Sequence, residues 1–398
     1  MRKYILLGFL GAAVSASIVV AAIVGAKHAH QRSTSSNSDN PSVAARKLQS
    51  DVDSYATFPQ RLSTNHWNRV QYSAVVIFGA SDCDDAHPRS PIFADTVRGK
   101  FLLSLSSSAP YWHGRFTNGP VFGEYMAAST LTGNNISLLN YAYGDATVNN
   151  GLTKVNAPDT RAQMEMYIGD VREKKAQRGD ERTGRVLHCV WIGINDIIQI
   201  WTDVIKNGTF QNGNIHGPQT GFEYATGRVH LEARELLDQV KLLHSHPLVN
   251  TLHSDFLLML IPPLEILPNL HYQSKTLAKN NPQLVNTYLE YIGNLTRLYN
   301  HELSEGIKAL SQEANRAGPD KAAISGNNLA YFDIPKYWYF VRSHPEVYNF
   351  VNVMDACWNS TTGANCKAPE RWKYYDTLHP STKMHEYIAQ EITVQVNL

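Results

Sequence analysis

Residues 76–84 read Val76-Ile77-Phe78-Gly79-Ala80-Ser81-Asp82-Cys83-Asp84, an apolar run closed by glycine, alanine and serine. Such a run, apolar on both faces, is typical of a strand buried in a parallel sheet. It places Ser81 in a tight turn at the carboxyl end of the strand, which is the exposure that a nucleophile needs. An isolated Gly-x-Ser is more often an ordinary turn. The stretch therefore indicates a nucleophile only if other segments of the chain supply the partners that such a serine needs.

Short apolar runs and longer helical patterns alternate through the rest of the chain. Apolar residues recur at helical spacing in residues 231–244 and 286–310, and the strand candidates are residues 74–78, 137–142, 186–192, 256–261 and 329–334. This succession predicts the α/β class: a three-layer α/β/α sandwich with a parallel sheet of about five strands, in the flavodoxin-like manner. Ligands of such folds bind at the carboxyl ends of the strands, so the residues that follow each strand are the candidates for chemistry.

Two further segments bring reactive side chains to that edge. The third strand candidate ends in Trp191-Ile192-Gly193-Ile194-Asn195-Asp196, and an asparagine amide there can donate to a developing oxyanion. Near the C-terminus the chain reads Asp376-Thr377-Leu378-His379-Pro380, in which a carboxylate stands three residues before an imidazole. One short loop can then supply a general base and the carboxylate that orients it. Each segment alone also fits a simple turn, because Asn and Asp bend chains for local reasons.

In order and in sheet position, the three segments together resemble the SGNH hydrolases, also called the GDSL esterase and lipase family. The resemblance covers residues 66–398, which we expect to form a single catalytic domain. It implies that Ser81 is the nucleophile, that His379 is the general base and that Asp376 orients the imidazole.

The same resemblance implies an oxyanion hole. Its donors are the Ser81 amide, the Asn195 side chain and a backbone amide at Asp145, with Gly144 one place earlier as the alternative donor. Two positions depart from the family pattern: Ala80 replaces the aspartate of Gly-Asp-Ser, and Asp145 stands where the family has a glycine. A carboxylate beside a developing anion opposes the charge unless it is turned away or protonated.

Other blocks are similar to the fungal carbohydrate esterases of this family. They comprise residues 114–120, residues 140–147, the pair of cysteines near the C-terminus and the tail that follows His379. The resemblance implies a serine esterase that removes a short acyl group, such as acetyl, from a carbohydrate, without a cofactor. A lipase acting on longer acyl esters is the near alternative, and a non-catalytic binding protein on the same scaffold is the distant one.

Composition restricts the partners. The 398 residues include 36 Lys plus Arg and 35 Asp plus Glu, which gives a formal net charge of +1. A net charge so close to zero does not indicate binding to nucleic acid. His244 and His246 have no Cys or carboxylate at ligand spacing and are interpreted as a solvated helix end, so no metal is predicted. The expected partner is a small-molecule or polysaccharide ester, and no oligomeric state is predicted.

The N-terminus differs from the rest of the chain. Arg2 and Lys3 precede an uncharged apolar run of 23 residues, at 4–26, which is long enough to span a bilayer core of about 30 Å as a helix. Residues 1–26 therefore predict a signal anchor, with a cleaved signal peptide as the alternative, because Val24 and Ala26 satisfy the small-residue rule for cleavage. The polar residues 27–65 predict a flexible stalk. Either interpretation delivers the catalytic domain to the secretory pathway, as a lumenal or extracellular domain that contacts the membrane through the N-terminal segment if it is uncleaved.

Sequons and cysteines agree with that location. The N-x-[ST] triplets that predict glycosylation are at Asn135, Asn207, Asn294 and Asn359. In an oxidising compartment we expect a disulfide between Cys357 and Cys366, which lie nine apart in a polar segment. Cys189, inside an apolar run, is expected to be a buried free thiol, and Cys83 has no assignment.

Overall fold

The structure is a computed structural model that describes residues 72–86, 111–128, 136–176, 178, 184–207, 221–250, 253–279, 281–316 and 328–396. The predicted signal anchor or signal peptide (1–26) and the predicted stalk (27–65) lie outside these residues and stay predictions. Within the described part of the chain, no helix has both the length and the apolar character needed to cross a membrane.

A five-stranded parallel sheet forms the centre of the described domain. Its strands lie in the order β2-β1-β3-β4-β5, and every neighbouring pair is parallel. They are β1 (Tyr72–Gly79), β2 (Ser137–Asn140), β3 (Arg185–Trp191), β4 (Ser254–Met259) and β5 (Leu329–Phe332). The five apolar runs therefore form the expected strands in the flavodoxin-like order, and the predicted fold class is confirmed. Strands β1, β3 and β4 are buried almost throughout, because helices cover both faces of the sheet.

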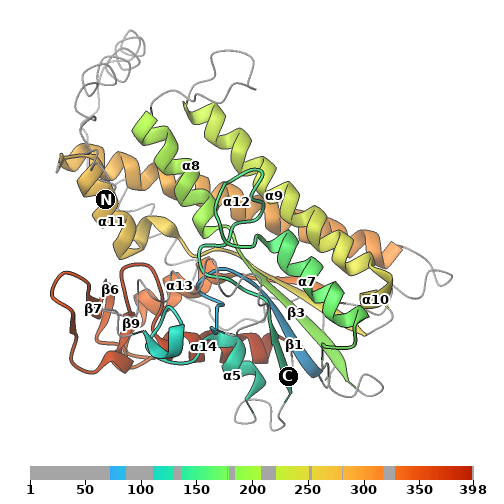
Figure 1. The fold of residues 1–398 in the computed structure, drawn as a ribbon. Helices are drawn as coiled ribbons and strands as arrows, with labels where there is room; N and C mark the ends of the chain where they lie inside the picture. Colours follow the sequence, from blue (N-terminus) through green and yellow to red (C-terminus); the bar gives the residue numbers. More distant parts are fainter. Residues whose placement is uncertain are drawn as a thin grey trace, which may run out of the picture. The chain divides into compact units, whose positions relative to one another are not determined.

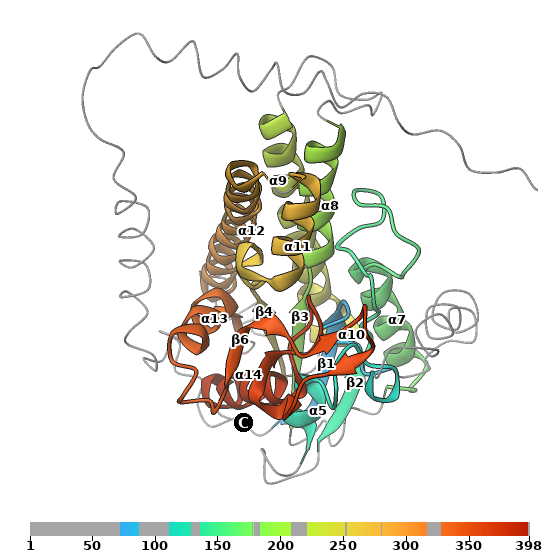
Figure 2. The same cartoon turned by 90° about the vertical axis from the view of Figure 1, so that its left-hand side faces the viewer.

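Figures 1 and 2 show the two helical layers. One layer contains α5 (Phe122–Ala127) and α14 (Thr382–Val396). The opposite layer contains α7 (Thr160–Arg172), α8 (Ile194–Asn207), α9 (Gly221–Ser245) and α12 (Pro282–Arg316). Shorter helices connect these elements: α10 (Pro247–Asn250), α11 (Pro268–Leu277) and α13 (Ile334–Ser343).

The two helical patterns expected from the sequence lie in α9 and α12. In α9, Leu236, Val240 and Leu243 are buried at helical spacing, as an amphipathic helix requires. The helix ends at Ser245 as expected, but the interpretation of His244 as solvated was wrong. Its ring is buried 5.1 Å from that of Phe256 in β4, and burial lowers the pKa of His244 below its ordinary value.

A small subdomain precedes α14. Strand β6 (Asn352–Ala356) pairs in parallel with β9 (Trp372–Tyr374), and β7 (Trp358–Asn359) pairs antiparallel with β8 (Ala364–Asn365). The disulfide between Cys357 and Cys366 is present beside this hairpin, so its prediction is confirmed. Cys189 is a buried free thiol, as expected, and Cys83 is another.

Candidate active site

The turn after β1 places Ser81 at the carboxyl edge of the sheet. The Cys83 amide donates to Ala80 O at 2.9 Å and closes the turn. Gly79 is required before it, since a Cβ at this position would stand 2.4 Å from Trp191 O on β3. The side chain of Gln163, from α7, fixes the backbone of Gly79 with two hydrogen bonds. It accepts from the Gly79 amide at 2.9 Å and donates to Gly79 O at 3.0 Å. A tight turn fixed in this way fits a serine whose hydroxyl must keep one orientation.

The loop between β9 and α14 brings an imidazole to that serine. His379 Nε2 lies 2.8 Å from Ser81 Oγ, and His379 Nδ1 lies 2.7 Å from Asp376 Oδ2. The other carboxylate oxygen, Asp376 Oδ1, accepts from the amides of Leu378 and His379, both at 2.7 Å. The loop therefore folds around the carboxylate, which explains why three residues of spacing suffice to align Asp376 with the imidazole.

Tyr111 supplies a further contact that sequence reasoning missed. Its hydroxyl donates to Asp376 Oδ2 at 2.6 Å, from a position 265 residues earlier in the chain. The Tyr111 ring packs 5.6 Å from Trp358 and 5.9 Å from Tyr375, two side chains of the cluster beside the Cys357 disulfide. The disulfide subdomain thus supports the residue that holds Asp376.

The charges of the histidine and aspartate support each other. Burial opposes a charged Asp376, but the His379 charge and the hydrogen bonds hold the pKa of Asp376 below its ordinary value. Burial likewise opposes a charged imidazole, yet the Asp376 carboxylate outweighs it and raises the pKa of His379. An imidazole that takes a proton from Ser81 is therefore stabilised in its charged form.

Asp82, directly after the serine, is a second site residue that sequence reasoning did not assign. It is buried, and its Oδ1 has no hydrogen-bond partner among the described residues. Burial raises the pKa of Asp82 to about 6, with the His379 charge acting in the opposite direction. At neutral pH its carboxylate adds negative charge near His379, which also contributes to the raised pKa of that imidazole.

The expected oxyanion donors differ in whether their hydrogens already have an acceptor in the protein. Within the described residues, the amides of Ser81 and Asp145 have no acceptor, whereas the Gly144 amide donates to Asp84 Oδ2 at 2.9 Å. Asn195 donates one amide hydrogen to Ala146 O at 2.9 Å, and its second hydrogen remains for another acceptor. This geometry favours Asp145 over Gly144 as the backbone donor.

Asp145 has the backbone of the glycine that the family places there. Its φ is +63°, in the left-handed region, and its side chain is exposed. Although the residue as a whole is exposed, partial burial of its carboxyl raises the pKa of Asp145, while the His379 charge lowers it. The carboxylate therefore lies within electrostatic reach of His379, where it would stabilise the imidazolium as well as oppose an oxyanion.

Because these two effects oppose each other, Asp145→Gly should leave kcat for p-nitrophenyl acetate within about fivefold of wild type. Steady-state kinetics at neutral pH measure this. A gain of about 30-fold or more would show that the carboxylate faces the oxyanion. A comparable loss would give it a role in substrate binding.

The fold is α/β, and the arrangement of Ser81, His379 and Asp376 resembles that of serine hydrolases. The profile of the GDSL-like Lipase/Acylhydrolase family matches residues 75–392, which hold Ser81, Asp376 and His379. The chain belongs to this family, whose description names lipases and acylhydrolases.

One relative adds a more distant likeness. The chain is 24% identical over 301 residues to the thermolabile hemolysin of Vibrio parahaemolyticus serotype O3:K6 (strain RIMD 2210633). The match covers 71% of this chain and 56% of the hemolysin, so the chain spans about half the length of that relative.

Proposed function

We propose that the chain hydrolyses carboxylic esters with Ser81 as nucleophile, His379 as general base and Asp376 as the acid that orients the imidazole. The observation that carries the proposal is the continuous hydrogen-bonded series from Ser81 Oγ through both imidazole nitrogens to Asp376 Oδ2. It is the arrangement that converts a weakly nucleophilic hydroxyl into an attacking group.

The reaction proceeds in two displacements. His379 Nε2 takes the Ser81 proton as Oγ attacks the ester carbonyl, and the amides of Ser81 and Asp145 with the Asn195 side chain stabilise the oxyanion. The imidazolium then gives its proton to the leaving alcohol, and the acyl group stays on Ser81. A water molecule, deprotonated by His379, releases the acid and restores the serine.

The preferred substrate is a short acyl ester, such as acetyl, on a carbohydrate. Beyond the segments that resemble fungal carbohydrate esterases, the proposal is supported by aromatic residues beside the site. Trp112 is 37% exposed and directly follows Tyr111, whose hydroxyl binds Asp376. The guanidinium of Arg115 lies 4.5 Å from the Trp112 ring centre and holds it in place. An exposed indole with a fixed orientation suits the apolar face of a sugar ring.

Longer acyl esters of lipids are the second candidate. The family description includes lipases, and the relative reported above is named a thermolabile hemolysin. This alternative predicts activity that rises with acyl length.

A panel of p-nitrophenyl esters from acetate to dodecanoate separates the two candidates. We expect kcat/KM to be highest for acetate and to fall with acyl length. A maximum at eight carbons or more would overturn the short-acyl proposal and favour a lipase.

The carbohydrate part of the proposal is tested with Trp112→Ala. This change should raise KM for glucose pentaacetate about three- to tenfold, as expected for one aromatic contact, and leave p-nitrophenyl acetate unaffected. Leu242→Ala, at an exposed apolar position on α9, is the matched control. Equal effects of Trp112→Ala on both substrates would contradict a sugar contact.

The secretory location also remains a proposal. Asn294 and Asn359 are exposed, as glycan acceptors must be, whereas Asn135 and the side chain of Asn207 lie outside the described residues. The disulfide is typical of an oxidising compartment. A loss of mass on endoglycosidase treatment of the protein from a eukaryotic secretory host would support this location, and its absence would count against it.

A further inference from the structure

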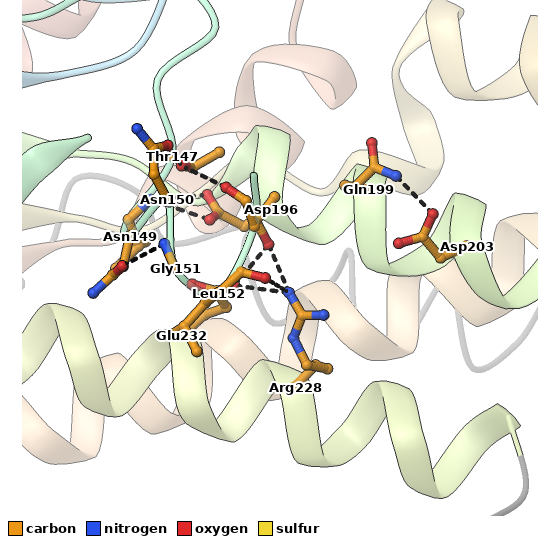
Figure 3. Close-up of polar contacts among 12 residues, drawn as sticks. Thr147, Asn149, Asn150, Gly151, Leu152, Asp196, Gln199, Asp203, Arg228 and Glu232 are labelled. Atoms are coloured by element: carbon orange, nitrogen blue, oxygen red, sulfur yellow. Dashed lines mark hydrogen bonds and ion pairs between the residues drawn. The ribbon is translucent and has the colours of Figure 1, made fainter. Parts of the chain in front are cut away.

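A pair of buried acids lies beside the proposed oxyanion hole. Asp196 stands in the first turn of α8, directly after Asn195, and Glu232 lies in α9 (Figure 3). Both side chains are completely buried, and the Glu232 charge raises the pKa of Asp196, so the two carboxyls lie within electrostatic reach of each other. Two ionised carboxylates that are buried close together repel each other without screening by water, so a proton on one of them is favoured.

The charges that face the pair agree with one retained proton. Arg228 is the cation that contacts it among the described residues, with Nη2 3.4 Å from Glu232 Oε1. The same guanidinium also donates to Thr153 Oγ1 and to the hydroxyl of Tyr224. The phenol of Tyr299, from α12, faces both acids and is itself buried. Arg228 thus contacts Glu232 and not Asp196, and burial raises the pKa of both acids.

The pair holds the backbone that carries the oxyanion donors. Asp196 accepts from the Val148 amide with both oxygens, at 3.1 and 3.3 Å. Glu232 Oε1 accepts from Thr153 Oγ1 at 2.7 Å, farther along the same loop. Asn195 donates to Ala146 O in that loop, immediately after Asp145. The acids therefore connect α8, α9 and the loop at residues 145–153.

We propose that Asp196 and Glu232 share one proton and act as positioning residues that hold Asn195 and the Asp145 amide in the oxyanion hole. The positioning role rests on the proposed function, whereas the shared proton does not. Neither acid touches the reacting atoms. Their effect on catalysis passes through the loop and through the first turn of α8.

The shared proton is tested by unfolding. The folded pair keeps its proton, while an unfolded carboxyl loses it above about pH 4, so the pair's contribution to stability falls as pH rises from there to the raised pKa. Glu232→Gln keeps the shape of the side chain, can donate an amide hydrogen to Asp196 and needs no proton. Urea titrations from pH 6 to 8 should show that the variant releases about one proton fewer on unfolding than wild type.

Glu313→Gln is the matched control, because Glu313 is exposed and pairs with Lys241 at 3.1 Å. This control should leave the proton release unchanged. Equal proton release by wild type and Glu232→Gln would overturn the shared proton.

The positioning role is tested by kinetics of p-nitrophenyl acetate hydrolysis. Glu232→Gln should keep kcat within about threefold of wild type, whereas Glu232→Ala should lower it about tenfold or more at unchanged KM, because the donors lose their alignment. Equal kcat in the two variants would overturn the positioning role and leave the unfolding result intact. An inactive wild-type enzyme would instead contradict the proposed function.

Discussion

Ser81→Ala is expected to lower kcat for p-nitrophenyl acetate by about 10⁴- to 10⁶-fold. The alanine removes the oxygen that His379 Nε2 contacts at 2.8 Å, so no acyl-enzyme can form. The turn itself rests on backbone bonds and on Gly79, so the variant should fold like wild type.

Ser343→Ala, at an exposed position on α13, is the control for this change and should keep full activity. Thermal unfolding of both variants verifies that the fold is retained. Turnover by Ser81→Ala within about tenfold of wild type would assign the nucleophile to another residue.

Asn195→Ala should lower kcat by about 10²- to 10³-fold with little change in KM, the usual effect of removing one oxyanion donor. The local backbone explains why the side chain is so placed. Gly193, with φ of +118°, turns the chain sharply between β3 and α8, and a Cβ there would stand 2.4 Å from the Tyr299 ring. The bond to Ala146 O then fixes the carboxamide, and its second hydrogen bonds to no residue that the structure describes.

Two further variants serve as the comparison and the control for Asn195→Ala. Asn195→Asp keeps the shape but removes both donor hydrogens and adds a negative charge, so it should lose at least as much activity as the alanine variant. Gln199→Ala removes an exposed carboxamide from the same helix and should have no effect. A change in KM alone for Asn195→Ala would assign the residue to substrate binding instead.

The sheet could be predicted from sequence because its signals are local. Each strand is a short, continuously apolar run that ends in small or polar residues, and each run coincides with a strand of the structure. The expectation that Ser81 and Asn195 lie at one edge followed from the same reasoning, because they come after neighbouring parallel strands. The role of His379 was implied by the family resemblance instead.

The remaining features depend on contacts between distant segments. Tyr111 reaches Asp376 across 265 residues, and no local pattern marks either of them for this contact. The bond from the Gly144 amide to Asp84 likewise depends on the approach of two turns, which is why the sequence left Gly144 and Asp145 as alternatives. His244 was misjudged for a similar reason, since the packing of α9 on β4, and not its position at the helix end, decides its burial.

Reaction with an active-site phosphonate, followed by mass spectrometry of the digested protein, tests the proposed nucleophile most directly. A serine activated by His379 and Asp376 should take up one phosphonyl group, on the peptide that contains Ser81, and Ser81→Ala should take up none. Labelling of a different serine, or full esterase activity in a protein whose Ser81 peptide stays unlabelled, would contradict the assignment of Ser81 as the nucleophile.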